Sequence, residues 1–359
     1  TAKYLQTLAT TDSEDEEDTE TTMPFIVVDA LQLNAVKLDY HSVPGGIKAM
    51  ADIKNFLIKV PKADLANQDI EVNRLALKNA DFLIETTTME PVNEIVETQT
   101  FRLPDWKIVV NEIAFENNNI GYFVDEAQTV SGRFNPSAID IKSFELLADN
   151  LSMKDNAIQL NLESLKLQEA SGISVKSLGF DVSFTENELA LNDIDIHINN
   201  NFLKGNLLLD YPSFDDLFNS PENLTLNTNL SDIQIVLKDA FLFSPELKKN
   251  QYLYQLSKHP LNGNLQLRGS LSNLQIPKVN LLWGNTSITT RGRLKEVLNT
   301  QKMSFDFPEL LVRTTRKDAL LFVNEKDLGI SIPEEVMLKA NFKGKLNDIA
   351  AKPMYLSKI

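Results

Sequence analysis

Residues 173–198 read ISVKSLGFDVSFTENELALNDIDIHI, and this stretch decides the fold class. Apolar residues occupy every second position from Leu178 to Phe184 and again from Ile194 to Ile198. A period of two places the apolar side chains on one face of a β-strand and the polar ones on the other. Glu186-Asn187 separates the two runs, as a tight turn between neighbouring strands requires. The stretch therefore predicts an antiparallel hairpin with one apolar face.

The same alternation recurs from about residue 25 to residue 346. It predicts an all-β chain, in which one long curled antiparallel sheet forms a repeating β-groove, a taco-like trough. Turn residues separate the runs at 117–119, 154–156, 171–172, 199–201 and 283–285. The residues expected to line the apolar interior of the trough are Leu160, Leu162, Phe180, Val182, Phe184, Ile194, Ile196, Ile198, Leu207, Leu209, Leu265, Leu267, Leu281, Trp283 and Ile288.

Roughly twenty strands spaced about 4.8 Å apart would make a sheet on the order of 100 Å long. Open sheets of more than about ten strands usually curl, close or divide, because strand twist accumulates. Packed sandwiches, a closed barrel or a trough could each hide the apolar face. The short turns favour a trough, since it needs contacts between sequential strands only.

Internal echoes support a repeating unit of several strands. The pentapeptide at 52–56 returns at 140–144, and the one at 203–207 resembles 290–294. We expect an acidic linker over 1–23, groove repeats over 24–103, 104–235 and 261–359, and a helical insertion or plug over 236–260. One short helix is predicted, from Pro245 to Lys258, with Ser244 as its N-cap.

The composition argues against several partners and chemistries. A net charge of -15 and a pI near 4.8 disfavour nucleic acid, since binding phosphates requires clustered Lys and Arg. The chain has no cysteine, which excludes disulfides and thiolate sites within it. It begins at Thr1 and contains no run of about eighteen apolar residues. We interpret it as an internal fragment whose anchor or targeting signal lies elsewhere.

No catalytic or metal site is predicted. The sequence has no phosphate-binding loop, nucleophile elbow or zinc-binding histidine pair. His197 alternates with isoleucines and is expected on the polar face, and the pair Asp193 and Asp195 is interpreted in the same way. The acidic run at 12–20 could supply oxygen ligands to calcium, but it lacks the glycine of a calcium-binding loop, so a solvated loop is favoured. We expect a protein that is not an enzyme and has no cofactor.

Three motifs carry a family resemblance: Gly269 to Leu274, Trp283 to Thr286 and Arg291 to Leu294. Together they resemble the repeating unit of TamB-like proteins in the AsmA-like superfamily. Residues 139–210 resemble the version found in Bacteroidetes-type bacteria. The resemblance implies a β-groove that is anchored at the inner membrane, crosses the periplasm and moves phospholipids between membranes. It also implies an Omp85-type outer-membrane barrel as a partner. The membrane helix and the barrel-contacting region of that pattern are absent from this sequence.

The function we expect is that of a periplasm-spanning lipid conduit, linked to outer-membrane assembly, which shields phospholipid acyl chains in its groove. The alternative is a structural assembly factor, or scaffold for outer-membrane or surface proteins, whose β core is packed dry. A carbohydrate-binding rod is a third hypothesis, but it would need exposed aromatic clusters.

Overall fold

The computed structural model of the chain describes residues 25–88, 101–345 and 348–358. These residues form one 17-stranded sheet. Its strands are β1 (Phe25–Ser42), β2 (Ile47–Asp64), β3 (Asp69–Val72), β4 (Arg74–Thr86), β5 (Lys107–Val124), β6 (Ala138–Lys154), β7 (Ala157–Glu169), β8 (Ser174–Phe184), β9 (Glu188–Ile198), β10 (Asn201–Asp210), β11 (Thr225–Ile235), β12 (Leu261–Ser270), β13 (Asn273–Trp283), β14 (Thr286–Lys295), β15 (Ser304–Thr315), β16 (Glu335–Lys345) and β17 (Asp348–Lys358).

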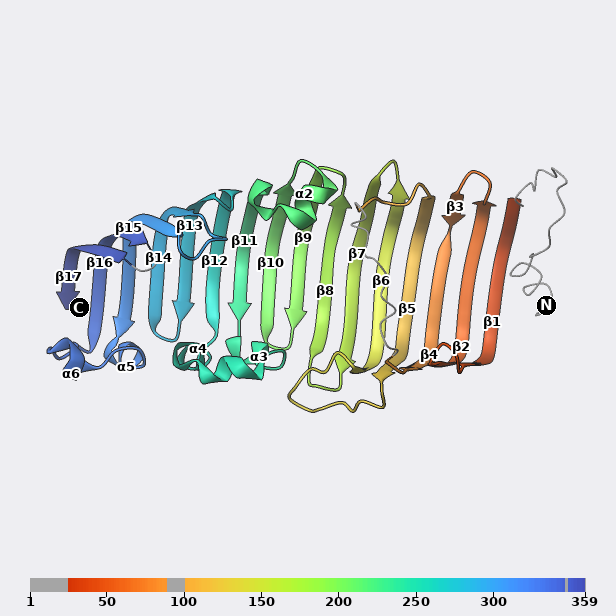
Figure 1. The fold of residues 1–359 in the computed structure, drawn as a ribbon, viewed down its shortest axis with the longest axis horizontal. Coiled ribbons are helices and arrows are strands. Elements are labelled where there is room, and N and C mark those ends of the chain that lie inside the picture. The colour runs from red at the N-terminus through yellow and green to blue at the C-terminus, as the bar shows by residue number, and fades with distance from the viewer. Residues whose placement is uncertain (1–24, 89–100, 346–347, 359) are drawn as a thin grey trace.

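The strands lie side by side in sequence order, in a single row from β1 to β17 (Figure 1). β3 and β4 both pair with β2 and with β5, so together they fill one strand position in the row. We call each strand position a rung. The seventeen strands therefore make sixteen rungs, which at about 4.8 Å per rung span on the order of 70 Å. The upper ends of the strands from β13 onward bend over, so the sheet curls at this end (Figure 1).

The predicted all-β, mainly antiparallel sheet is confirmed. One part of the topology was not predicted, because β5 runs parallel to β3 and β4. A parallel neighbour requires the chain to return to the starting end of the previous strand. Alternation within a strand gives no information about the direction of the neighbouring strand, so the sequence pattern could not predict the parallel pairing.

The single helix expected from Pro245 to Lys258 is wrong in its extent. A 3₁₀ segment, η2 (Pro245–Lys249), ends at Asn250, and a separate helix, α4 (Gln251–Leu256), begins there. Asn250 caps α4, because its Oδ1 accepts hydrogen bonds from the backbone N–H groups of Tyr252 at 3.0 Å and Leu253 at 3.1 Å. Further short helices, which were not expected, lie at the ends of strands: α2 (Phe214–Asn219), η1 (Pro221–Asn223), α3 (Leu237–Ala240), α5 (Arg316–Ala319) and α6 (Glu325–Leu328).

The expected turn at 117–119 is also wrong. Asn117 lies inside β5, where it adopts φ 50° and forms part of a bulge between Phe115 and Asn118. Its Nδ2 donates to Oδ1 of Asn79, 2.7 Å away, and Asn79 has φ 53° in the neighbouring β4. Asparagine tolerates this left-handed conformation, so the same residues suit a turn and a bulge equally. The turns expected at 154–156, 171–172, 199–201 and 283–285 do separate strands.

The echoed motifs each lie within a strand of the same sheet. The motif at 203–207 lies in β10 and its echo at 290–294 lies in β14. Hydrogen bonding runs without a break from β4 to β5 and from β11 to β12, across the division expected at 103–104 and past the helical segment at 236–260. The described residues therefore form one continuous sheet, and the helical segment is an excursion at its lower edge (Figure 1).

Gly205 marks a bulge that only glycine fits. It has φ 151°, and a Cβ there would overlap the backbone carbonyl oxygen of Asn229 on β11. The register between β10 and β11 shifts at this point.

Gly205→Ala should therefore lower the free energy of unfolding by about 2 kcal/mol or more, since the bulge would have to open. Urea unfolding measures this change. Asn227→Ala, at an exposed position of β11, is the control, and equal unfolding midpoints for the two variants would contradict the assignment.

Candidate functional site

The strand register brings apolar residues into continuous rows on one face of the sheet. Residues that face each other directly across paired strands lie on the same face, so each row can be followed from one printed partner to the next. The first row crosses β1 to β12, and its members are Ile26, Ala63, Ile70, Ile108, Met153, Ile158, Phe184, Leu189, Leu209, Leu226 and Gly269. Apart from its last member, this row is apolar throughout.

A second row on the same face continues from β8 to β16. Its members, from β8 to β16, are Leu178, Ile196, Leu203, Ile233, Gly263, Leu281, Ile288, Val312 and Leu338. Both rows cross β8 to β12, so they belong to one face. We call this face, as defined by the two rows, the apolar face.

All fifteen residues predicted to line the groove belong to this face by strand register and alternation. Bulges preserve the phase where spacing in the sequence changes. Leu191 and Ile194 are three residues apart, yet both lie in apolar phase because Asp193, at φ 51°, forms a bulge between them. Because of the same bulge, Asp193 and Asp195 do not follow the simple alternation that would place their two side chains side by side on one face.

The predicted lining residues differ in how far they are covered. Leu162, Ile194 and Trp283 are each 6% exposed, and the other twelve are half-buried. Sequence reasoning left out the part of the face near the N-terminus, where Leu38 is 56% exposed and Tyr40 is 60% exposed. It also omitted Phe305, which stacks on Phe342 with ring centroids 4.7 Å apart. The same alternation marks these residues in the sequence, so the signal was available.

No second sheet covers the apolar face within the described residues, since all of their strands belong to one row (Figure 1). Cover occurs at the rims instead. At the upper rim, Phe214 of α2 packs with Leu103, Tyr211 and Leu224 in a buried cluster that also contacts Phe184. This cluster closes the strand ends from β7 to β11 and leaves the middle of the strands open.

The lower rim is closed around Trp283. Its Nε1 donates to the carbonyl oxygen of Leu256 at 2.7 Å, and its ring contacts His259 and Phe322 with centroid distances of 5.1 and 5.4 Å. Asp318 lies beneath these residues at 1% exposure and accepts a hydrogen bond from the backbone N–H of Asn285 at 2.7 Å. Trp283 therefore holds the rim together, although it shares the phase of the apolar face.

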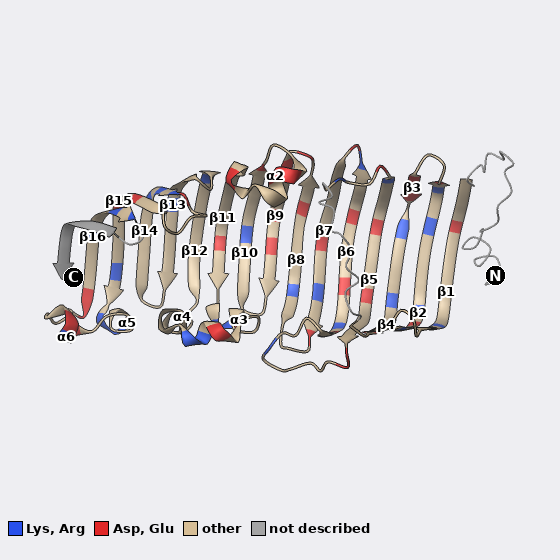
Figure 2. Ribbon diagram, in the orientation of Figure 1, with Lys and Arg blue, Asp and Glu red and all other residues tan. Residues whose placement is uncertain are grey.

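Charged residues of both signs occur along the strands (Figure 2), and strand register places pairs such as Lys204 with Asp195 and Lys48 with Glu85 on the opposite, polar face. His197 lies there, as expected, with Nε2 2.8 Å from Asp195 Oδ1. Lys204 Nζ lies 3.0 Å from the other carboxylate oxygen of Asp195. The hydrogen bond from Lys204 and its positive charge lower the pKa of the Asp195 carboxyl below its usual value. These contacts describe a solvated ion pair.

The described residues offer no cluster of three or more His, Cys, Asp or Glu side chains that could hold a metal ion. The acidic run at 12–20 lies outside the described residues. None of the helices within the described ranges is long and apolar enough to cross a membrane. No known family model matches the chain, and neither a curated protein nor a solved structure shows significant similarity to it.

Tyr211 provides a test of the upper rim. Its hydroxyl donates to the carbonyl oxygen of Thr185 at 2.7 Å, and burial raises the pKa of the phenol from 10.0 to about 12. The folded chain favours the neutral phenol, so its contribution to stability is complete below pH 10 and is lost as the pH rises toward 12.

Tyr211→Phe should therefore be less stable than the natural chain by about 1 kcal/mol at pH 8, because the hydrogen bond is lost. The difference should shrink between pH 10 and pH 12, because in this range the unfolded natural chain loses its phenol proton while the folded chain keeps it. The Tyr211→Phe variant has no such proton to lose. Urea unfolding across this pH range measures both effects, with Tyr252→Phe, at a 64% exposed position, as the control. A difference that stays constant with pH would contradict the role given to the buried phenol.

Proposed function

We propose that this chain is a lipid conduit, in which the apolar face shields phospholipid acyl chains from water. The observation that carries the proposal is the continuity of the two apolar rows from β1 to β16 without a covering layer in the described residues. Soluble proteins rarely leave contiguous apolar patches of more than a few hundred Å² to water. A face of this extent needs an apolar occupant, and an acyl chain meets that need.

The energetics suit such an occupant. Exposing the roughly thirty CH₂ groups of a two-chain phospholipid to water costs on the order of 25 kcal/mol, at about 0.8 kcal/mol per group. A face of aliphatic side chains offsets most of that cost. Because one rung resembles the next, an acyl chain would find similar surroundings along the sheet and could slide between them.

The polar residues on the apolar face also suit acyl chains. Asn118 is 1% exposed and lies opposite Phe144, with its Oδ1 accepting from the N–H of Ala80 at 2.9 Å. Thr228 is 5% exposed, and its hydroxyl donates to the carbonyl oxygen of Asn206 at 2.8 Å. Both groups are already hydrogen-bonded to the protein backbone. They therefore add little polarity to the surface that a lipid would meet.

The resemblance to TamB-like proteins extends the proposal to a location and partners. We place the chain in the bacterial periplasm, between inner and outer membranes, as part of a longer protein that is anchored to the inner membrane. Through regions outside this sequence it would serve outer-membrane assembly together with an Omp85-type barrel. The alternative, a scaffold with a dry packed core, has less support because twelve of the fifteen lining residues are half-buried.

A charge in the middle of the apolar face should block lipid binding. Ile196→Asp and Leu207→Asp place a carboxylate on this face, where desolvation by an acyl chain would be costly. We expect at least a tenfold loss of lipid per chain, measured by mass spectrometry of the purified protein and by lipid transfer between vesicles.

Leu208→Asp is the matched control, since Leu208 is also half-buried but points to the opposite face of β10. Circular dichroism would verify that all three variants keep their sheet structure. The proposal fails if the natural chain carries no lipid, or if folded variants of Ile196 and Leu207 bind as much lipid as the Leu208 variant.

A further inference from the structure

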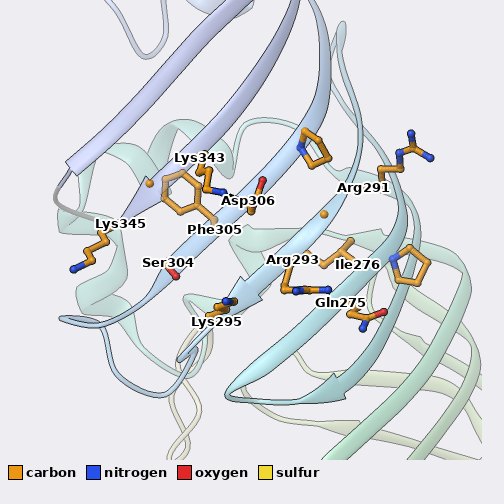
Figure 3. A pocket seen from close by; sticks show the side chains of 14 residues that line it. Gln275, Ile276, Arg291, Arg293, Lys295, Ser304, Phe305, Asp306, Lys343 and Lys345 are labelled. Carbon is orange, nitrogen blue, oxygen red and sulfur yellow. Dashed lines mark hydrogen bonds and ion pairs between the residues drawn. The ribbon is translucent and has the colours of Figure 1, made fainter.

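A hollow of about 970 Å³ lies on the sheet where β13 to β16 bend (Figure 3). The bend follows from bulges, since the strand register shifts between Ile276 and Val279 and again between Phe307 and Leu310. Pro277 and Pro308 stand at these shifts, where a strand can accommodate a residue that lacks an N–H donor. Bulges bend strands and increase their twist, and Figure 3 shows the curved strands around the lining side chains.

Strand register gathers basic side chains in this hollow. One row of paired residues runs Gln275, Arg293, Asp306 and Lys343 across the four strands. The next row contains Lys295, Ser304 and Lys345. Both rows alternate with the apolar residues and so belong to the polar face. Ile276 and Phe305, which belong to the apolar phase, also line the hollow, but its charged side chains all come from the polar face. The inference drawn from these charges does not depend on the proposed lipid conduit.

The charge of the hollow is opposite to that of the chain. Its lining includes five cations, Arg291, Arg293, Lys295, Lys343 and Lys345, and one carboxylate, Asp306, whereas the whole chain has a net charge of -15. Asp306 Oδ2 is 2.7 Å from Lys343 Nζ, and Glu309 nearby contacts Arg291 at 3.5 Å.

Arg293 and Lys295 form no ion pair with any carboxylate in the described part of the chain. Both side chains are exposed. Two cations at one end of β14 are thus available to an anion from solution.

We propose that this hollow binds the phosphate group of a phosphate-bearing organic anion. Arginine donates two parallel hydrogen bonds to phosphate oxygens, and lysine adds a compact positive charge. The volume lies in the upper part of the range of small-molecule sites, about 300 to 1,000 Å³, and exceeds the needs of a bare phosphate ion. The exposed Pro277 and Pro308 offer apolar contact to the remainder of the ligand. An anionic lipid headgroup and free phosphate share this chemistry.

The experiment titrates the protein with inorganic phosphate and with a short-chain phosphatidic acid, followed by calorimetry at low ionic strength. The variant R293Q/K295Q should weaken binding at least tenfold. K154Q/K176Q removes the same charge at exposed positions on β6 and β8 and should stay within twofold of the natural chain. Tighter binding of phosphatidic acid than of phosphate would support an anionic lipid headgroup as the ligand, whereas equal binding of the two would overturn the organic part of the proposal and leave free phosphate as the ligand.

Leu207→Asp separates this site from the apolar face, because it should leave phosphate binding unchanged. The proposal is overturned if neither probe binds saturably, or if K154Q/K176Q weakens binding as much as R293Q/K295Q. It is also overturned if phosphatidic acid binding is lost in Leu207→Asp but unchanged in R293Q/K295Q, because the lipid would then bind through the apolar face alone.

Discussion

The structure depends on the phase of alternation being kept from one strand to the next. A slip of one residue in any pair would turn all apolar side chains of that strand to the other face. The chain keeps the phase even where strands bulge, and at some places neighbouring strands bulge together. Val72 and Leu75 are three residues apart and lie beside Val110 and Ile113, which have the same spacing. Asn73 and Asn111 are the extra residues in these two segments. The Nδ2 of Asn111 donates a hydrogen bond to Oδ1 of Asn73 at 3.0 Å, so the two bulges are joined to each other.

The two faces of the single-layer sheet have different roles: one carries charged side chains and the other carries the apolar rows. On the polar face, ion pairs between neighbouring strands, such as Lys48 with Glu85 at 2.8 Å, bridge the rungs at exposed positions. Exposed pairs of this kind contribute little stability each, about 0 to 1 kcal/mol, so backbone pairing and apolar contacts along the rows must hold the sheet. The rim cover from α2 and around Trp283 protects strand ends while the middle of the apolar face stays open. A charged face and an open apolar face thus coexist in one layer.

Sequence patterns predicted the part of this architecture that is local. Alternation in each strand placed all fifteen predicted lining residues in one phase, because a period of two needs no tertiary information. The parallel pairing of β5 with β4 was missed, since it depends on the path between strands. The single helix expected at 245–258 was wrong because Asn250 caps a new helix there.

The basic hollow could not be predicted from the sequence either. Arg293 and Lys343 are 50 positions apart and come together only through the register of Asp306 between them. Asn117 shows the same limitation on a smaller scale, since its residue type suits both a turn and a bulge. In each case the missing information is which strands are neighbours and where their registers shift.

Photo-crosslinking to lipid from adjacent positions of one strand tests the central claim most directly. A photoreactive residue at position 207 points to the apolar face and one at position 208 points to the polar face. Both positions lie in β10, and both natural leucines are half-buried. The proposed conduit predicts crosslinked phospholipid at position 207 and none at position 208. Equal capture at both positions, or none at either, would contradict a face that shields acyl chains.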